Sequence, residues 1–202
     1  MKTIKINDNG IEVVILQHLL GLTPDGIFGQ QTDNALRMYQ SHNRLEVDGI
    51  CGNKTWNALL GYDLKRSARQ INEIIIHCSA TPEGKDVSVE EIRQYHKKVR
   101  GWKDIGYHYV IYRDGSVHNG RDVDWVGAHT TNHNQRSIGI CYIGGCKGNT
   151  NQPKDTRTPQ QKKAMDELVY IMRQLYPNAT VHGHNEFAVK ACPCFNVKKE
   201  YR

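Results

Sequence analysis

The sequence has no long apolar run. Its 202 residues are 38% hydrophobic and 8% aromatic, and the mean hydropathy is −0.64. No stretch approaches the roughly 20 apolar residues that a membrane-spanning helix needs. The first eight residues also lack the apolar segment that forms the core of a secretory signal peptide. We therefore expect no membrane insertion, and we expect synthesis in the cytoplasm without a signal peptide.

A regular cysteine framework is also missing. The six cysteines follow no repeated spacing, so the sequence predicts no set of disulfides. Cys141 and Cys146 flank a segment that ends in a Gly-Gly pair, and they could form a disulfide if that turn is tight. Free thiols are the default expectation.

Clustered positive charge is absent as well. Lys and Arg exceed Asp and Glu by 27 to 21, which gives a net charge of +6. These basic residues are scattered, and the sequence contains no helix-turn-helix, zinc-finger spacing or aromatic stacking motif. We therefore expect no nucleic-acid partner. The charge predicts only a general attraction to anionic surfaces or polymers.

Three metal-binding side chains stand at or near the ends of predicted strands. His77 ends the apolar run at residues 74–76, His184 follows residues 179–181, and Cys192 comes eight positions after His184. Two imidazoles and one thiolate would give zinc three protein ligands and leave the fourth tetrahedral position for water. Structural zinc sites use four protein ligands instead. The pattern predicts a hydrolytic site with one zinc ion per chain.

Each of these ligands has an alternative on residue type and spacing alone. A histidine at the end of a buried strand is more often a hydrogen-bonded core residue than a ligand. His182 lies two positions before His184, on the same face if the segment is extended. Cys194 lies close to Cys192, and buried cysteines often have only a packing role. The sequence also lacks the His-Glu-x-x-His pattern of metalloproteases.

Five short motifs occur in order across residues 71–202. They are His77-Cys78-Ser79-Ala80-Thr81, Gly106-Tyr107-His108-Tyr109, Arg113-Asp114-Gly115, Ser137-Ile138-Gly139-Ile140 and Lys190-Ala191-Cys192-Pro193. Together they resemble the zinc-dependent N-acetylmuramoyl-L-alanine amidases, a family that includes phage lysozymes with amidase activity and the peptidoglycan recognition proteins. The order and similar spacing of all five motifs make this resemblance far more specific than any single motif.

The resemblance implies which ligands to choose. In the family pattern the second histidine lies eight residues before the cysteine, which selects His184 over His182 and Cys192 over Cys194. The sequence departs from the phage enzymes at Cys194 and Asn196, where those enzymes carry serine and aspartate. This difference leaves the expected ligands unchanged.

The resemblance also implies a catalytic tyrosine at Tyr107 and a catalytic lysine at Lys190. A tyrosine hydroxyl can orient water or relay a proton, and a lysine can stabilise the oxyanion that develops during amide hydrolysis. Without the resemblance, Tyr107 would be interpreted equally well as a core aromatic residue. Lys190 would be interpreted as a solvated loop cation.

A long polar loop spans residues 121–136. Loops of this length in compact domains are often functional. In the amidase family the matching loop lines the substrate groove, which makes Trp125, His129 and Asn134 candidate substrate-binding residues. The alternative is an ordered surface loop without ligand contacts.

The N-terminal part contains an internal repeat. Residues 25–36 and 48–59 share an Asp-Gly-Ile turn, a glycine, a threonine and an Asn-Ala-Leu sequence. Each copy is typical of a tight turn that leads into a helix. With an apolar-rich helix at residues 11–22 and a helix that continues through residues 35–39, the repeat predicts a three-helix domain of about sixty residues.

This repeat resembles the peptidoglycan-binding domain that often accompanies cell-wall hydrolases. The resemblance rests on Pro24-Asp25-Gly26-Ile27-Phe28-Gly29 and on Val47-Asp48-Gly49. The alternative is a purely structural helical bundle, in which the Asp-Gly pairs only form turns.

The two resemblances and the apolar patterns predict two domains. We expect a three-helix peptidoglycan-binding domain at residues 1–62, a basic linker at 63–70, and an α/β zinc amidase domain at 71–202 with a mixed central sheet flanked by helices. The expected strands are residues 71–77, 105–112, 117–119, 137–143 and 180–182, and the expected helices are residues 89–98 and 159–175.

The expected function is therefore hydrolysis of the amide bond between N-acetylmuramic acid and L-alanine in peptidoglycan. We expect a monomeric phage or prophage endolysin that reaches the cell wall after release by another protein. Two alternatives remain. Cys192 could be a thiolate nucleophile with His184 as its base, as in a cell-wall peptidase. The chain could also be a non-catalytic peptidoglycan receptor.

Overall fold

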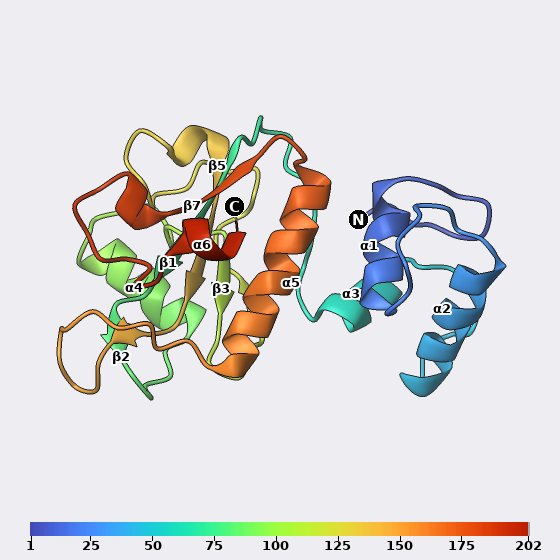
Figure 1. The fold of residues 1–202 in the computed structure, drawn as a ribbon, viewed down its shortest axis with the longest axis horizontal. Coiled ribbons are helices and arrows are strands. Elements are labelled where there is room, and N and C mark those ends of the chain that lie inside the picture. Colours follow the sequence, from blue (N-terminus) through green and yellow to red (C-terminus); the bar gives the residue numbers. More distant parts are fainter. Residues whose placement is uncertain (202) are drawn as a thin grey trace. The chain divides into compact units, whose positions relative to one another are not determined.

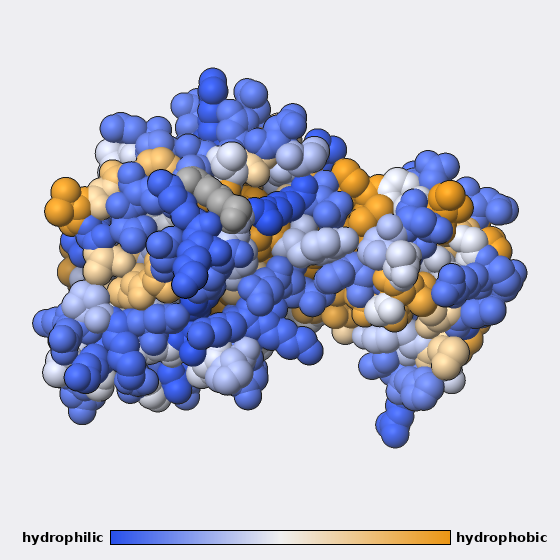
Figure 2. All heavy atoms as spheres, viewed as in Figure 1, coloured by the Kyte–Doolittle hydropathy of each residue, from blue (hydrophilic) through white to orange (hydrophobic). Residues whose placement is uncertain are grey.

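The computed structural model describes residues 1–201. The chain divides into two compact units, Met1–Arg66 and Ser67–Arg202 (Figure 1). Hydrophilic residues cover most of the visible surface of the larger unit (Figure 2). In the part of the chain that the structure describes, no helix has the length and apolar character needed to cross a membrane.

The smaller unit contains the three expected helices. They are α1 (Ile11–Leu19), α2 (Gln30–His42) and α3 (Asn53–Leu60). Helix α1 is shorter than the predicted segment 11–22 because Gly21 adopts a left-handed conformation with φ of 72°. The amide of Leu22 then donates to the carbonyl of Gln17 and closes the helix end.

A buried glutamine holds the Asp-Gly-Ile turn in each copy of the repeat. Gln17 Nε2 donates to Asp25 Oδ1 at 2.7 Å, while its Oε1 accepts from the amides of Asp25 and Gly26. Gln40 Nε2 likewise donates to Asp48 Oδ1 at 2.8 Å, and its Oε1 accepts from the amide of Gly49. Both glutamines are almost fully buried. The repeat is therefore a structural unit in which a helix residue fixes the turn that follows.

The larger unit is built on a mixed five-stranded sheet with strand order β4-β3-β5-β1-β7. The strands are β1 (Glu73–Cys78), β3 (Tyr109–Ile111), β4 (Val117–Asn119), β5 (Ser137–Tyr142) and β7 (Thr180–Gly183). Strand β1 pairs in parallel with β5 and β7, β3 pairs in parallel with β5, and β4 is antiparallel to β3. This arrangement confirms the predicted mixed sheet.

Helices α4 (Val89–Lys98) and α5 (Pro159–Leu175) lie on opposite sides of this sheet (Figure 1). Both have the predicted bounds, and each begins with a capping box. Ser88 and Glu91 cap α4, while Thr158 and Gln161 cap α5. Strand β1 is buried almost throughout, as expected for a parallel strand covered on both faces.

Some elements differ from the sequence-based expectation. The predicted strand at 105–112 is regular only from Tyr109 to Ile111. Before it, the carbonyls of Gly106 and Tyr107 accept from the loop amides of Ala128 and Arg121, so this backbone pairs with the loop after β4. Short elements that were not predicted are β2 (Thr81–Pro82), β6 (Gly145–Cys146), α6 (Val197–Tyr201) and the 3-10 turns η1 (Asn134–Arg136) and η2 (His184–Glu186). All six cysteines are free thiols, including Cys141 and Cys146.

Candidate active site

Two neighbouring parallel strands bring the predicted histidines together. His77 lies near the carboxyl end of β1, and His184 starts η2 directly after β7. Ile76 pairs with Gly183, so the residues that follow them, His77 and His184, lie at the same edge of the sheet. The two imidazole rings have centroids 4.6 Å apart.

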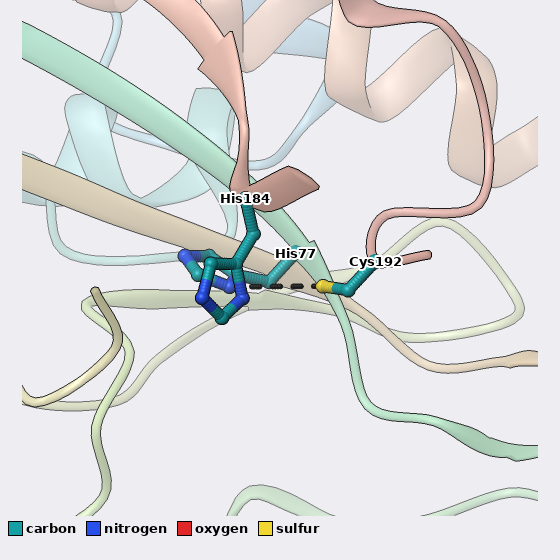
Figure 3. A group of neighbouring side chains, drawn as sticks. All are labelled: His77, His184 and Cys192. Carbon is teal, nitrogen blue, oxygen red and sulfur yellow. Dashed lines mark hydrogen bonds between the residues drawn. The ribbon is translucent and has the colours of Figure 1, made fainter. Parts of the chain in front are cut away.

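Cys192 completes this cluster from the loop after η2 (Figure 3). One donor atom from each of His77, His184 and Cys192 can be chosen so that all three lie within 4.8 Å of one another. The loop is tied down because Asn185 donates its amide to the Cys192 carbonyl at 2.7 Å. The Cys78 amide donates to the Cys192 sulfur at 3.3 Å. These contacts hold the sulfur beside the histidines.

The two histidines are kept neutral by their surroundings. His77 is 1% exposed, and desolvation lowers its pKa well below the ordinary value, with nearby His129 and His184 adding to the effect. Desolvation, helped by the positive charge of Lys190, lowers the pKa of His184 to about 4. Neutral imidazoles have a free lone pair, which is the form that binds metals.

The donor set fits a zinc ion. Tetrahedral zinc with bonds of about 2.0 to 2.3 Å needs ligand atoms about 3.5 Å apart. Nδ1 of His77 lies 3.8 Å from the Cys192 sulfur, close to this spacing. Two nitrogen ligands and one sulfur ligand leave a fourth position open, as catalytic zinc requires.

The competing residues have other partners. His182 pairs through Nδ1 with Glu186 at 3.0 Å and through Nε2 with Thr180 Oγ1 at 2.7 Å. The Cys194 sulfur lies 3.7 Å from the Cys78 sulfur and donates to the Gly145 carbonyl. The contact with Cys78, together with desolvation, raises the pKa of Cys194 and keeps it a neutral thiol. The structure therefore places His184 and Cys192 beside His77, whereas His182 and Cys194 are not part of this cluster.

A cleft of about 640 Å³ opens over the cluster and contains both predicted catalytic residues. The Tyr107 ring lies 5.2 Å from the His77 ring, measured between centroids. Desolvation, strengthened by the thiols of Cys141 and Cys192, raises the pKa of Tyr107 well above its ordinary range, so its hydroxyl keeps its proton at neutral pH. Lys190 is solvent-exposed and brings a positive charge to the cleft.

The three loop candidates have different surroundings. His129 lines the cleft but is only 7% exposed. Trp125 is 63% exposed. In the part of the chain that the structure describes, neither Trp125 nor Asn134 lines the cleft. The Asn134 side-chain oxygen accepts from the amides of His129 and Thr130, both at 2.8 Å, so it stabilises the loop. Substrate binding by Trp125, His129 and Asn134 stays a prediction.

One wall of the cleft was not predicted. It comes from α4 and the segments around it, and includes Lys85, Glu91, Tyr95, His96, Arg100 and Trp102. The spacing of Ile92, His96 and Val99 indicates one face of a helix. Helical spacing does not tell which part of that face borders a cleft and which part packs on the sheet.

Comparisons with known proteins show which families the two units match. Residues 67–195, more than half of the chain, match the family described as N-acetylmuramoyl-L-alanine amidase. Residues 13–59 match the family described as putative peptidoglycan binding domain. An endolysin of Klebsiella phage KP32 is 44% identical over 133 residues, which cover 65% of this chain and 85% of the relative. Peptidoglycan-recognition protein SC2 of Drosophila melanogaster is 34% identical over 56% of this chain and 60% of its own length.

A solved structure shows the same fold. The endolysin from the Thermus scotoductus bacteriophage Ph2119 aligns with a TM-score of 0.55 and 26% identity. The alignment covers 73% of this chain and 97% of that endolysin. The family match, the endolysin relative and the shared fold agree. This chain therefore belongs to the N-acetylmuramoyl-L-alanine amidase family.

Proposed function

We propose that one zinc ion, held by His77, His184 and Cys192, is the catalytic centre of this peptidoglycan amidase. The enzyme hydrolyses the amide bond between N-acetylmuramic acid and the L-alanine of the stem peptide. The observation that carries the zinc proposal is the meeting of the three donor atoms within 4.8 Å. The cleft above them also contains Tyr107 and Lys190, the two side chains that amide hydrolysis would need beside a metal.

Zinc bound here would lower the pKa of a water molecule to about 7 and polarise the substrate carbonyl. The protein's own groups would supply the remaining chemistry. Lys190 can place its ammonium group beside the negative charge that develops on the carbonyl oxygen. Tyr107 is protonated at neutral pH, so its hydroxyl can donate a hydrogen bond to that oxygen or pass a proton toward the leaving nitrogen.

The smaller unit has a separate role in this proposal. Residues 13–59 match a putative peptidoglycan-binding family, and we assign residues 1–62 to attachment at the polymer that the larger unit cleaves. Attachment raises the local concentration of the catalytic unit at an insoluble substrate. In this interpretation one chain works as a monomer, as an endolysin that reaches the wall after another protein opens the membrane.

The alternatives receive less support. A cysteine peptidase would use Cys192 as the nucleophile, but the family match is to amidases and not to peptidases. A non-catalytic receptor would need only a binding cleft. It would have no need of the three donor atoms together with Tyr107 and Lys190.

The test of the reaction is mass spectrometry of purified peptidoglycan after digestion by the full-length protein. We expect free stem peptides that begin with L-alanine, and glycan strands whose muramic acid keeps its lactyl group. New reducing sugar ends would identify a glycosidase, and stems cut internally would identify a peptidase. A separate zinc assay decides the cofactor, because chelation should abolish activity and added zinc should restore it.

A further inference from the structure

His129 contacts the predicted ligand His77 on the side that faces away from Cys192. Nδ1 of His129 lies 3.1 Å from Nε2 of His77, and the two rings meet nearly edge to face with an interplanar angle of 78°. The other nitrogen of His77, Nδ1, faces the Cys192 sulfur. His77 therefore has one nitrogen toward the donor cluster and the other toward His129.

This geometry determines where the protons lie when His77 binds a metal through Nδ1. A neutral imidazole has one proton, so Nε2 of His77 must carry it and donate to His129 Nδ1. Nδ1 of His129 is then an acceptor, which leaves the His129 proton on Nε2. That nitrogen lies 3.3 Å from Oγ of Ser137, a buried residue at the start of β5 that can accept the proton's hydrogen bond.

The His129 ring is confined on two sides. An added Cβ at Gly127 would lie 2.5 Å from Cδ2 of His129, and an added Cβ at Gly139 would lie 2.6 Å from the same atom. Only a residue without a side chain leaves room for the ring at these two positions. The Asn134 oxygen also anchors the His129 backbone amide. The ring therefore has little freedom to turn away from His77.

A third polar atom contributes to the same contact. Thr130 Oγ1 lies 3.1 Å from Nδ1 of His129 and 3.4 Å from Nε2 of His77. Since it is farther from His77 than His129 is, the imidazole is the better placed acceptor for the His77 proton. Both ring nitrogens of His129 thus have partners inside the protein.

We infer that His129 is a positioning residue that holds His77 in the tautomer whose Nδ1 is free for the metal. This inference rests on the proposed zinc function. Metal-binding histidines commonly donate their second ring N–H to a fixed acceptor, and loss of such an acceptor costs about 10- to 100-fold in metal affinity. His129 is an unusual acceptor for this task because it is itself a histidine. Its own tautomer depends on Ser137.

The experiment measures zinc affinity of the full chain by competition with a chromophoric chelator. His129→Leu has a similar volume and no acceptor, and we expect its zinc affinity to fall about 10- to 100-fold. His129→Asn places an oxygen near the position of Nδ1 and should recover most of this loss. His108→Leu is the matched control. His108 is also buried, and its ring lies 5.7 Å from the His129 ring between centroids, but its Nδ1 accepts from the Gly139 amide and its Nε2 donates to the Trp125 carbonyl, so it has no bond to His77. Its zinc affinity should stay within about twofold of the wild type, well below the 10-fold loss expected at His129.

A second measurement avoids the question of whether His129→Leu folds. Histidine ¹⁵N resonances of the zinc-free wild type should show the proton of His77 on Nε2 and the proton of His129 on Nε2. The opposite tautomer at either ring overturns the inference. Equal zinc affinity of wild type and His129→Leu overturns it too, as does an equal loss in His108→Leu. If the wild type binds no zinc, the proposed function itself fails, which is a different result.

Discussion

The sulfur of Cys192 lies 3.8 Å from Nδ1 of His77, although 115 positions separate the two residues. Strand β1 supplies the histidine, and the loop after η2 supplies the cysteine. The Tyr142 hydroxyl at the end of β5 donates to the Pro193 carbonyl at 2.8 Å and fastens that loop to the sheet. The cluster therefore depends on three separate segments of the larger unit.

The first prediction concerns the proposed ligands. Replacing His77, His184 or Cys192 by alanine should abolish amidase activity and remove most bound zinc, since two protein ligands hold the ion poorly. Zinc content can be measured by elemental analysis of the purified variants. Cys194→Ala is the control and should keep its zinc, because the Cys194 sulfur contacts Cys78 and Gly145. If Cys194→Ala loses zinc while Cys192→Ala retains it, the assigned ligands are wrong.

The second prediction separates catalysis from metal binding. Tyr107→Phe removes a hydroxyl and keeps the ring, and activity should fall about 100-fold or more with zinc content unchanged. Lys190→Ala should cause a similar loss, on the order of 100-fold, because the developing oxyanion loses its positive partner. Both are measured on a soluble muropeptide, with zinc content determined in parallel. Loss of zinc in either variant would show a structural role instead.

The third prediction concerns acid stability of the zinc-free protein. Desolvation lowers the pKa of His108 to about 4, and it lowers the pKa of His96 to about 4 as well, from an ordinary value of 6.5. Between pH 4 and pH 6.5 these histidines bind more protons in the unfolded chain than in the folded one, so the free energy of unfolding must fall as the pH drops through this range. For His108 the loss reaches about 3 kcal/mol. Urea denaturation at pH 7 and pH 4.5 measures it.

His108→Leu provides the comparison for this prediction. The variant should be less stable than the wild type at pH 7, since the Gly139 amide loses its acceptor. On acidification it should lose less stability than the wild type, because the variant lacks the His108 side chain that takes up a proton when the chain unfolds. Equal losses in the two proteins would mean that His108 does not titrate as its burial implies.

Local signals explain which parts of the fold the sequence could predict. Helices α4 and α5 have the predicted bounds because Ser88 and Thr158 begin capping boxes just before amphipathic segments. The apolar run of β1 indicates a strand covered on both faces. The residues of segment 105–108 favour extended structure and predict a strand, but the carbonyls of Gly106 and Tyr107 accept from amides of the loop after β4.

The candidate site shows the same limit. Motif order suggested His77, His184 and Cys192, and the structure places these three together. No local sequence pattern predicts the contact of His129 with His77. It depends on how the loop places the His129 ring against Gly127 and Gly139, which are far apart in sequence from His77. The wall made by Trp102 and Tyr95 was missed for a similar reason, since the packing of α4 decides which of its residues border the cleft.

The fourth prediction tests the glutamine that fixes the first repeat. Gln17 is 3% exposed, and its side-chain oxygen accepts from two backbone amides. Gln17→Ala would leave those amides without this acceptor and should destabilise the smaller unit by about 2 to 4 kcal/mol. Urea denaturation of a fragment of residues 1–66 measures the change. The exposed Gln30→Ala is the control and should cost no more than about 0.5 kcal/mol. Similar values for both would show that the buried contacts do not matter.

The last prediction asks whether the smaller unit targets the enzyme or supports its fold. The Met1 amino group donates to the Leu64 carbonyl and Leu64 is buried, so the fragment should end at residue 66 rather than at 62. A catalytic fragment that starts at Ser67 corresponds to one compact unit, and it should fold, bind zinc and cleave a soluble muropeptide almost as fast as the full chain.

On insoluble cell walls the same catalytic fragment should be slower than the full chain. A binding unit raises local concentration at its polymer and adds nothing to the chemistry, so its loss matters only where the polymer is present. The fragment of residues 1–66 should in turn sediment with purified peptidoglycan. A fragment that stays in the supernatant, together with equal impairment of the catalytic fragment on soluble and insoluble substrate, would make the first sixty residues a structural support and end the binding assignment.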